Sequence, residues 1–296
     1  MRKKGNRTRR RSYPKRVILF WTVNLLLLIS ISFSAKLYLG LRKSPFWSLA
    51  RKTFVLVTEK QLLVFSFQDN EGLILNLPKD EKVPLTRDFG EYEWGKIYRL
   101  SKLEGMDGLL LEEAVQKNLR VPVFGYFYDP SEFDYSKLKG KSFFGLILWR
   151  ALKGEVETDL NNFDLAILYL KSKKLSDTEI RMKDFGGRLE SSFKDTDLRK
   201  ESYALEILNS TEHLGLAQEV AELLENAGGR VIRLADTDQV EENCLLLPKD
   251  KVEESYTLFW LGVVFDCRVE KAEKTETRAE ITLIIGEKYW KNLNEK

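Results

Sequence analysis

Histidine and cysteine, whose imidazole and thiol groups bind transition metals or act in catalysis, are rare in this chain. His213 is the only histidine, and Cys244 and Cys267 are the only cysteines. Two cysteines are too few for a disulfide-rich scaffold or a thiolate zinc site. Outside the cytoplasm they could form one bridge, but their spacing alone does not indicate it, and we expect buried free thiols. His213 precedes a predicted helix with no second ligand nearby, so we expect a surface residue.

A long charged segment, PKDEKVPLTRDFGEYEWGK (residues 78–96), is the other place where polar side chains gather. It shows no regular apolar pattern, and long irregular loops carry function more often than packing. Two interpretations stay open: a charged site for a ligand, or the solvated face of a surface loop. The charged side chains that matter below are Lys79, Asp80, Arg87, Asp88 and Lys96.

The start of the chain combines a strongly basic tail with an uncharged apolar run. The net charge is +3, but residues 1–16 hold nine basic side chains and no acidic one, which leaves −6 on residues 17–296. VILFWTVNLLLLISISFSA, residues 17–35, carries no charge. As a helix it is ~28 Å long, close to the ~30 Å hydrocarbon thickness of a bilayer. We therefore predict a single-pass transmembrane helix over residues 17–39.

The uneven positive charge predicts the orientation of this helix. Only Lys36, Arg42 and Lys43 follow it closely, so the positive-inside rule places residues 1–16 in the cytoplasm and the bulk of the chain outside. The lipid bilayer, including its anionic headgroups, is then the first predicted partner. Two alternatives are a cleaved signal peptide, for which SFSA offers small residues, and a basic arm that binds nucleic acid. The apolar run is longer than a signal-peptide core, and we expect no nucleic-acid partner, because sixteen residues are too few for such a fold.

Beyond a linker that contains Pro45, strand and helix signals follow one another as in an α/β protein. KTFVLV, QLLVFSF and LILNL predict three strands, GMDGLLLEEAVQKNL a helix and VPVFGYFYD a further strand. SFFGLILWRALKG and NNFDLAILYLKSKK predict two more helices, the second capped by polar residues of TDLNN. This order predicts an α/β (α+β) domain over residues 44–184, followed by a polar linker over residues 185–202.

Residues 203–296 predict a small second domain made of two βαβ-like halves. YALEIL predicts a strand, an amphipathic helix follows and ends at Gly228, and RVIRL predicts a strand that returns. CLLL, VEESYTLFWLGVVF and AEITLIIG repeat this order. The corner after the first strand, Asn209-Ser210-Thr211, predicts a helix cap. It has no glycine-rich phosphate-binding pattern and precedes Glu212, so we expect no phosphate there.

This second domain resembles the LytR carboxy-terminal domain family over about residues 203–290. The resemblance rests on the corner Asn209-Ser210-Thr211, the helix opening Gly215-Leu216-Ala217 and the ending Gly286-Glu287-Lys288-Tyr289, in that order. Ser210 stands where the family usually has glycine. The family is usually found outside the cell on envelope proteins and has no catalytic role, so the resemblance implies binding or scaffolding.

The first domain is similar to a degenerate LytR-CpsA-Psr catalytic domain. Leu77-Pro78-Lys79-Asp80 matches that family's Ile-Pro-Arg-Asp motif, and Lys96-Ile97-Tyr98 is similar to its Lys-Ile-Asn motif. These enzymes transfer polyprenyl-pyrophosphate-linked glycopolymers to peptidoglycan. For an active protein the resemblance implies that Lys79 and Lys96 bind pyrophosphate, that Asp80 and Arg87 are catalytic, and that Asp80 and Asp88 bind Mg²⁺.

Departures from the family pattern speak against catalysis. Lys79 replaces the motif arginine and cannot make a planar bidentate grip on phosphate. The segment around Glu59-Lys60-Gln61 lacks the family's aspartate, and PSEFDYSKLKGK has no arginine where the family is arginine-rich. Because pyrophosphate transfer needs several cations and usually a metal, we expect no catalysis and no cofactor, with Mg²⁺ only if the chain is active.

Two functions from different classes follow from this sequence. The favoured one is a membrane-anchored extracytoplasmic cell-envelope protein, without catalysis, that binds or scaffolds peptidoglycan, an envelope glycopolymer or another envelope protein. The alternative is a divergent phosphotransferase that attaches polyprenyl-pyrophosphate-linked glycopolymer to peptidoglycan. Transcriptional regulation through the basic tail is suggested by charge alone.

Overall fold

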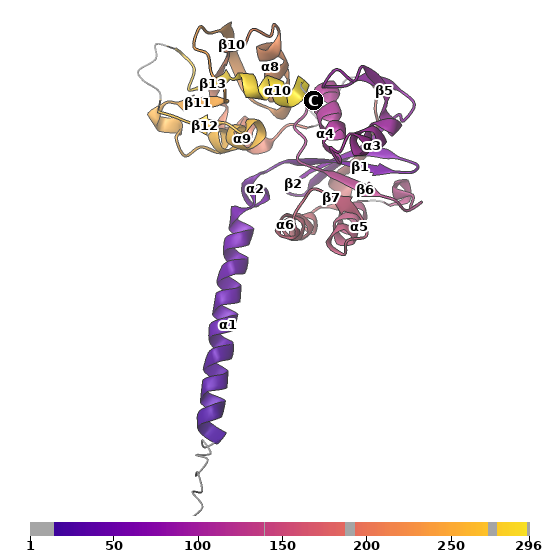
Figure 1. Ribbon diagram of the computed structural model, residues 1–296, viewed down its shortest axis with the longest axis vertical. Helices are drawn as coiled ribbons and strands as arrows, with labels where there is room; N and C mark the ends of the chain where they lie inside the picture. The colour runs from indigo at the N-terminus through magenta and orange to yellow at the C-terminus, as the bar shows by residue number, and fades with distance from the viewer. Residues whose placement is uncertain (1–14, 139, 187–192, 272–276, 295–296) are drawn as a thin grey trace, which may run out of the picture. The chain divides into compact units, whose positions relative to one another are not determined.

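The computed structural model describes residues 15–138, 140–186, 193–271 and 277–294, and the chain divides after Ser44 into two units (Figure 1). Within the described residues, the first unit is one helix, α1 (Lys15–Lys43). Its span from Leu19 to Lys43 contains an 18-residue stretch with a mean hydropathy of 1.6 and is long and apolar enough to cross a membrane. A membrane anchor and a signal sequence share these properties.

The second unit, residues 45–296, begins with the short helix α2 (Pro45–Ser48) and contains two larger sheets. The first sheet has six strands in the order β7–β6–β1–β2–β3–β8. β1, β2 and β3 form an antiparallel meander, while β6 joins β1 and β8 joins β3 in parallel. The strand bounds are β1 (Lys52–Thr58), β2 (Leu62–Gln68), β3 (Glu71–Leu77), β6 (Tyr126–Asp129), β7 (Glu157–Thr158) and β8 (Ile180–Asp184).

Helices cover both faces of this sheet, as Figure 1 shows, and the predicted mixed α/β architecture is confirmed in this part. The predicted cap of α6 (Asn162–Ser172) is also confirmed, because the Asn161 side chain accepts from the amides of Phe163 and Asp164. Burial on both faces explains why the central strands read as continuous apolar runs rather than as alternating ones. The helices are α3 (Trp94–Leu103) and α4 (Leu109–Leu119) on one face, and α5 (Lys141–Leu152) and α6 (Asn162–Ser172) on the other.

Aromatic side chains fill the space between the sheet and α5. Their rings lie 5.3–6.5 Å apart in tilted or edge-to-face pairs, and none is more than 1% exposed. Such packing adds to the free energy gained by burying these large apolar surfaces. The cluster consists of Phe54, Phe65, Phe67, Phe127, Phe143 and Phe144.

The charged segment over residues 78–96 is more regular than its sequence predicts. β4 (Lys82–Pro84) and β5 (Glu91–Glu93) pair as an antiparallel hairpin, and α3 starts at Trp94. Trp94, Ile97 and Tyr98 are buried against the first sheet, at spacings typical of one helix face. Gly95 and the charged residues between them obscure this pattern in the sequence.

The second sheet has five strands in the order β10–β9–β13–β11–β12. Its first half is the predicted βαβ unit: β9 (Ala204–Asn209), α8 (Leu216–Ala227) and β10 (Arg230–Asp236), with β9 and β10 parallel. Gly228 ends α8 at φ 103°, in the left-handed conformation that glycine adopts at low cost. Val220, Ala221 and Leu224 on α8 are buried, as the apolar stripe predicts.

The second half differs from the predicted repeat. β11 (Leu245–Pro248) and α9 (Tyr256–Phe265) are followed by β12 (Arg268–Val269), a two-residue strand that pairs in parallel with β11. The predicted closing strand is β13 (Ile281–Ile285), which lies between β9 and β11, parallel to the first and antiparallel to the second. The described part of the chain continues into α10 (Glu287–Asn294).

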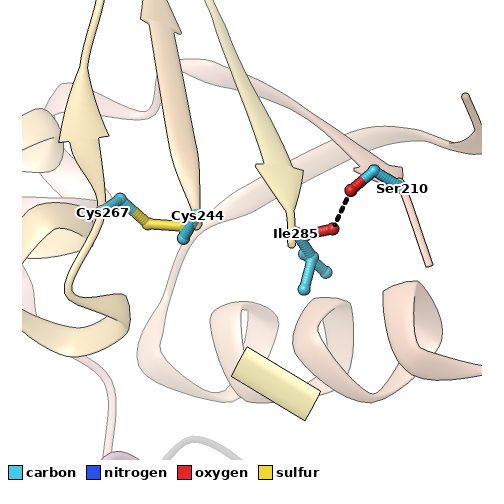
Figure 2. The surroundings of a disulfide bond; sticks show 4 residues. All are labelled: Ser210, Cys244, Cys267 and Ile285. Atoms are coloured by element: carbon cyan, nitrogen blue, oxygen red, sulfur yellow. Dashed lines mark hydrogen bonds between the residues drawn. A yellow bond between two sulfur atoms is a disulfide. The ribbon is translucent and has the colours of Figure 1, made fainter. Parts of the chain in front are cut away.

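The expectation of free thiols is wrong, because Cys244 and Cys267 form a disulfide (Figure 2). Cys244 precedes β11 and Cys267 precedes β12, so the bond joins the starts of two neighbouring strands across α9. The Arg268 amide donates to the Cys244 carbonyl at 3.1 Å and continues the same pairing. Spacing of 23 residues gave no sign of this proximity, which depends on the β11–α9–β12 crossover.

The Asn209-Ser210-Thr211 corner is not the predicted helix cap. Gly215 occupies the cap position of α8. Ser210 Oγ instead donates to the Ile285 carbonyl at 2.7 Å, which fixes the corner to the end of β13 (Figure 2). Asn209 Oδ1 accepts from the amide and hydroxyl of Thr211, so these side chains close the turn itself.

Residues 185–202, predicted as a polar linker, contain α7 (Thr196–Glu201) and a buried carboxylate at its cap, Asp195. Asp195 Oδ2 accepts from the Arg51 amide at 3.1 Å and from the Tyr256 hydroxyl at 2.6 Å. Burial and this carboxylate raise the pKa of Tyr256, which keeps its hydroxyl a donor. These bonds connect the start of the first sheet to the helices of the second.

Candidate functional site

Lys79, the predicted counterpart of the motif arginine, has its ammonium group occupied by main-chain carbonyls. Nζ donates to the Glu59 carbonyl at 2.8 Å and to the Thr58 carbonyl at 3.3 Å, at the turn between β1 and β2. Its stem lies over Gly95, where an added Cβ would come within 2.7 Å of Lys79 Cε. In this position Lys79 joins the β1–β2 turn to the start of α3.

Arg87 is held by Glu113 on α4. Its Nη2 and Nε lie 2.6 Å and 2.9 Å from the two carboxylate oxygens, a bidentate pair whose side chains are 12% and 9% exposed. The Thr86 hydroxyl donates to the same carboxylate at 2.8 Å. The hydrogen bonds that Arg87 donates to Glu113 raise the pKa of Arg87. The sequence does not reveal this pair, because 26 residues separate its members.

The other predicted site residues lie at the surface. Lys96 is exposed and pairs with Glu93 at 2.7 Å, one helical turn away. Asp80 and Asp88 are exposed as well. No group of three or more His, Cys, Asp or Glu side chains that could hold a metal is present among the described residues. The three predicted cations, Lys79, Arg87 and Lys96, therefore contact three different partners. The roles of Asp80 and Asp88 as magnesium ligands stay predictions.

A cavity of about 110 Å³ lies where α4 faces the second sheet's helices α8 and α10. α4 and Thr86 form one wall, and residues 213–223 and α10 form the other. On the first wall the lining side chains are Thr86, Glu113, Gln116, Lys117 and Arg120; on the second they are His213, Leu214, Leu216, Glu219, Leu223, Tyr289 and Trp290.

Arg120 lines this cavity and joins its two walls. It ends α4 in a left-handed conformation, φ 52°, and its guanidinium lies 3.2 Å from Glu219 and 3.3 Å from Glu222. Its carbonyl accepts from the Asn226 side chain at 3.1 Å. Because these partners all belong to α8, Arg120 holds α8 against the end of α4.

The opposite wall is built around the only histidine. His213 stacks on Trp290 with ring centroids 3.5 Å apart and planes inclined by 5°. Its Nε2 lies 3.1 Å from Glu287 Oε1 on α10. The His213 side chain is 31% exposed, so it lies at the surface as expected and also packs against α10. The sequence placed Tyr289 in a family motif but gave no sign of the His213–Trp290 stack.

The cavity presents groups suited to recognition. Its lining combines negatively charged carboxylates with a positively charged guanidinium and ammonium group, beside aromatic and aliphatic side chains. This arrangement suits a small polar group that carries both hydrogen-bond donors and acceptors. The Lys117 ammonium already donates to the Leu85 carbonyl at 2.9 Å. The Thr86 hydroxyl shares the Glu113 carboxylate with Arg87. Such pairing favours a structural role for this carboxylate over that of a base.

Comparison with known proteins gives weak likenesses. No protein-family model and no curated protein matches this chain. A transcriptional regulator from Enterococcus faecalis is 11% identical, with 63% of this chain and 91% of that chain covered and a TM-score of 0.38. Bacillus subtilis TagT is 13% identical (61% and 92% covered, TM-score 0.35), and a LytR-Csp2A-Psr enzyme from Actinomyces oris is 9% identical (82% and 89% covered, TM-score 0.20). Values this low establish neither a family nor an activity.

Proposed function

We propose that this chain is a membrane-anchored, extracytoplasmic cell-envelope protein that binds or scaffolds a wall polymer or a partner protein and does not catalyse. The observation that carries this proposal is the disulfide between Cys244 and Cys267. Disulfides persist in oxidising compartments and are rare in the reducing cytoplasm. The Cys244–Cys267 disulfide therefore supports a location of the second unit outside the cytoplasm. The basic residues before α1 predict the same location by an independent argument.

The absence of catalysis in this proposal is supported by the partners of the three cations. Lys79 is bonded to carbonyls, Arg87 to a buried carboxylate, and Lys96 to Glu93. A pyrophosphate group would have to break these contacts before it gained any stabilisation from them. Electrostatic catalysis depends on charges that are already aimed at the reacting group and need no reorganisation.

We place the proposed binding site at the cavity between α4 and α10, because charged groups of both signs lie next to aromatic side chains there. Peptidoglycan and envelope glycopolymers carry hydroxyl, amide and charged groups, which such a cavity can recognise by hydrogen bonding. The stacked pair His213–Trp290 adds aromatic surface beside the polar groups of the cavity. A partner envelope protein is the other ligand that the same surface suits.

Sidedness is the first prediction. The chain carrying one epitope tag at each end is expected to lose its carboxy-terminal tag when protease is added to cells with an accessible membrane, and to keep its amino-terminal tag. Both tags should disappear after detergent lysis, which controls for protease resistance. Recovery of an intact carboxy-terminal tag from unlysed cells, or of the whole chain in the soluble cytoplasmic fraction, would contradict the proposed orientation.

Binding without catalysis is the second prediction. Purified peptidoglycan should retain the wild-type chain, and Trp290→Ala should lower the bound fraction at least about fivefold, since buried aromatic side chains carry much of the energy of binding sites. Trp149→Ala, an exposed tryptophan on α5 outside the cavity, is the matched control and should bind like wild type. With Mg²⁺ and a polyprenyl-pyrophosphate analogue, no phosphate release is expected. Release that Lys79→Ala abolishes would establish the phosphotransferase instead.

A further inference from the structure

An apolar groove of about 560 Å³ lies on the outer side of α5 and α6, away from the cavity described above. Trp149 on α5 and Tyr169 on α6 form its walls, with ring centroids 5.8 Å apart. Trp149 is 45% exposed, and Leu170, which follows Tyr169 on α6, is 58% exposed. Large apolar side chains gathered on one surface mark contact with another molecule or with a membrane.

Lysines surround these exposed rings. Lys173 Nζ lies 4.5 Å from the centroid of Tyr169, and Lys153 Nζ lies 5.3 Å from that of Trp149. Lys174 follows directly and is exposed, while Glu155 lies 3.8 Å from Lys153. Lys141 also lines the groove and lies 4.0 Å from Asp177. Tryptophan, tyrosine and lysine together are typical of the interface between lipid hydrocarbon and water.

The groove lies on α5 and α6, and α6 contacts the first element that follows the apolar helix in the sequence, α2. Ser44 alone separates α1 from α2, and one residue spans at most ~3.6 Å. α2 is bonded to α6, because Lys171 Nζ donates to the Trp47 carbonyl at 2.7 Å. Trp47 is 53% exposed. The first element after the proposed membrane anchor is therefore fixed to the helix that carries Tyr169 and Leu170.

From these observations we propose that the α5–α6 face is a membrane-contact surface. Trp149, Tyr169 and Leu170 enter the headgroup region, and Lys173 and Lys174 lie at anionic lipid phosphates. The inference rests on the proposed anchoring by α1 but concerns a different surface. A lipid surface is the occupant that suits this face because it needs no shape complementarity beyond exposed rings flanked by cations.

Residues 45–296 can be tested without α1, since every buried apolar residue of both sheets lies between Phe46 and Ile285. This fragment is expected to bind vesicles that contain phosphatidylglycerol and to bind phosphatidylcholine vesicles much more weakly. Lys173→Glu/Lys174→Glu should weaken binding by about tenfold or more, because each basic residue near an anionic surface contributes separately. Lys82→Glu/Lys251→Glu, the same charge change at exposed sites on other elements, should bind within about twofold of wild type.

Tryptophan quenching by brominated lipids tests the aromatic part. Quenching of the bound fragment should fall in Trp149→Phe and should not change in Trp290→Phe. The proposal is overturned if wild type does not bind anionic vesicles, if both double lysine variants lose binding equally, or if quenching is the same in both tryptophan variants. Vesicle binding does not depend on the side of the membrane, so a failed protease test with successful binding rejects the orientation only. Correct orientation without binding rejects this surface only.

Discussion

Glu113→Ala is expected to lower the free energy of unfolding of residues 45–296 by about 3–5 kcal/mol, the range found when one partner of a buried ion pair is removed. The substitution leaves the Arg87 guanidinium, 12% exposed, without its carboxylate and removes the acceptor of the Thr86 hydroxyl. Urea unfolding followed by circular dichroism measures the change. A loss below about 1 kcal/mol would show that this pair behaves like a surface one.

Two controls separate the pair from general damage to α4. Arg87→Met/Glu113→Leu removes both charges and should be less destabilised than Glu113→Ala, because no buried charge is left unpaired. Glu132→Ala removes the partner of Lys60 in an exposed pair and should cost less than about 1 kcal/mol. A double variant that is less stable than Glu113→Ala would contradict the ion-pair explanation.

The same experiment bears on function, because Glu113 occupies the guanidinium that an active enzyme would aim at pyrophosphate. If Arg87 has only a structural role, removal of the Glu113 carboxylate does not create pyrophosphate binding. Inorganic pyrophosphate should then fail to stabilise either wild type or the variant. Stabilisation of wild type by millimolar pyrophosphate would indicate that this ion pair opens for a ligand.

The sequence predicts those parts of the fold that depend on local apolar patterning. The strands from β1 to β3 are continuous apolar runs, and α8 has an apolar stripe and a terminal Gly228, so both the strands and the helix are recognised. β8 could not be recognised in the same way, since Arg181, Met182, Lys183 and Asp184 are exposed at the edge of the sheet and show no alternation. Its position is set by pairing with β3, which the local sequence does not encode.

The candidate site was less predictable, because its contacts join distant parts of the chain. Polar side chains in the segment over residues 78–96 suggested a ligand site, yet the partners of Lys79 and Arg87 lie 20 and 26 residues away. A lysine bonded to carbonyls and a lysine waiting for phosphate look alike in a sequence. The cavity itself depends on where α10 meets α4, and that meeting has no signature in either segment.

Reduction of the disulfide is the other large expected effect. Opening the Cys244–Cys267 bond, which closes a loop with a sequence separation of 23, should lower the free energy of unfolding by about 3 kcal/mol in the chain-entropy model. For a unit of this size that corresponds to a Tm roughly 6–12 °C lower. Thermal unfolding with and without dithiothreitol measures the shift. The Cys244→Ala/Cys267→Ala variant should be equally destabilised and should no longer respond to the reductant.

The reason for so large an effect lies in the strand that the disulfide holds. β12 has only two residues, at the edge of the second sheet, and the amides of Arg268 and Glu270 donate to the carbonyls of Cys244 and Leu246 at 3.1 and 3.0 Å. Backbone hydrogen bonds to so short an edge strand do little to hold a segment whose side chains are exposed. The disulfide therefore adds a covalent restraint on β12, while the end of α9 is also held by the buried ring of Phe265. If free thiols were labelled in protein purified without reductant, or if dithiothreitol left the Tm unchanged, this restraint and the extracytoplasmic assignment that depends on it would both fail.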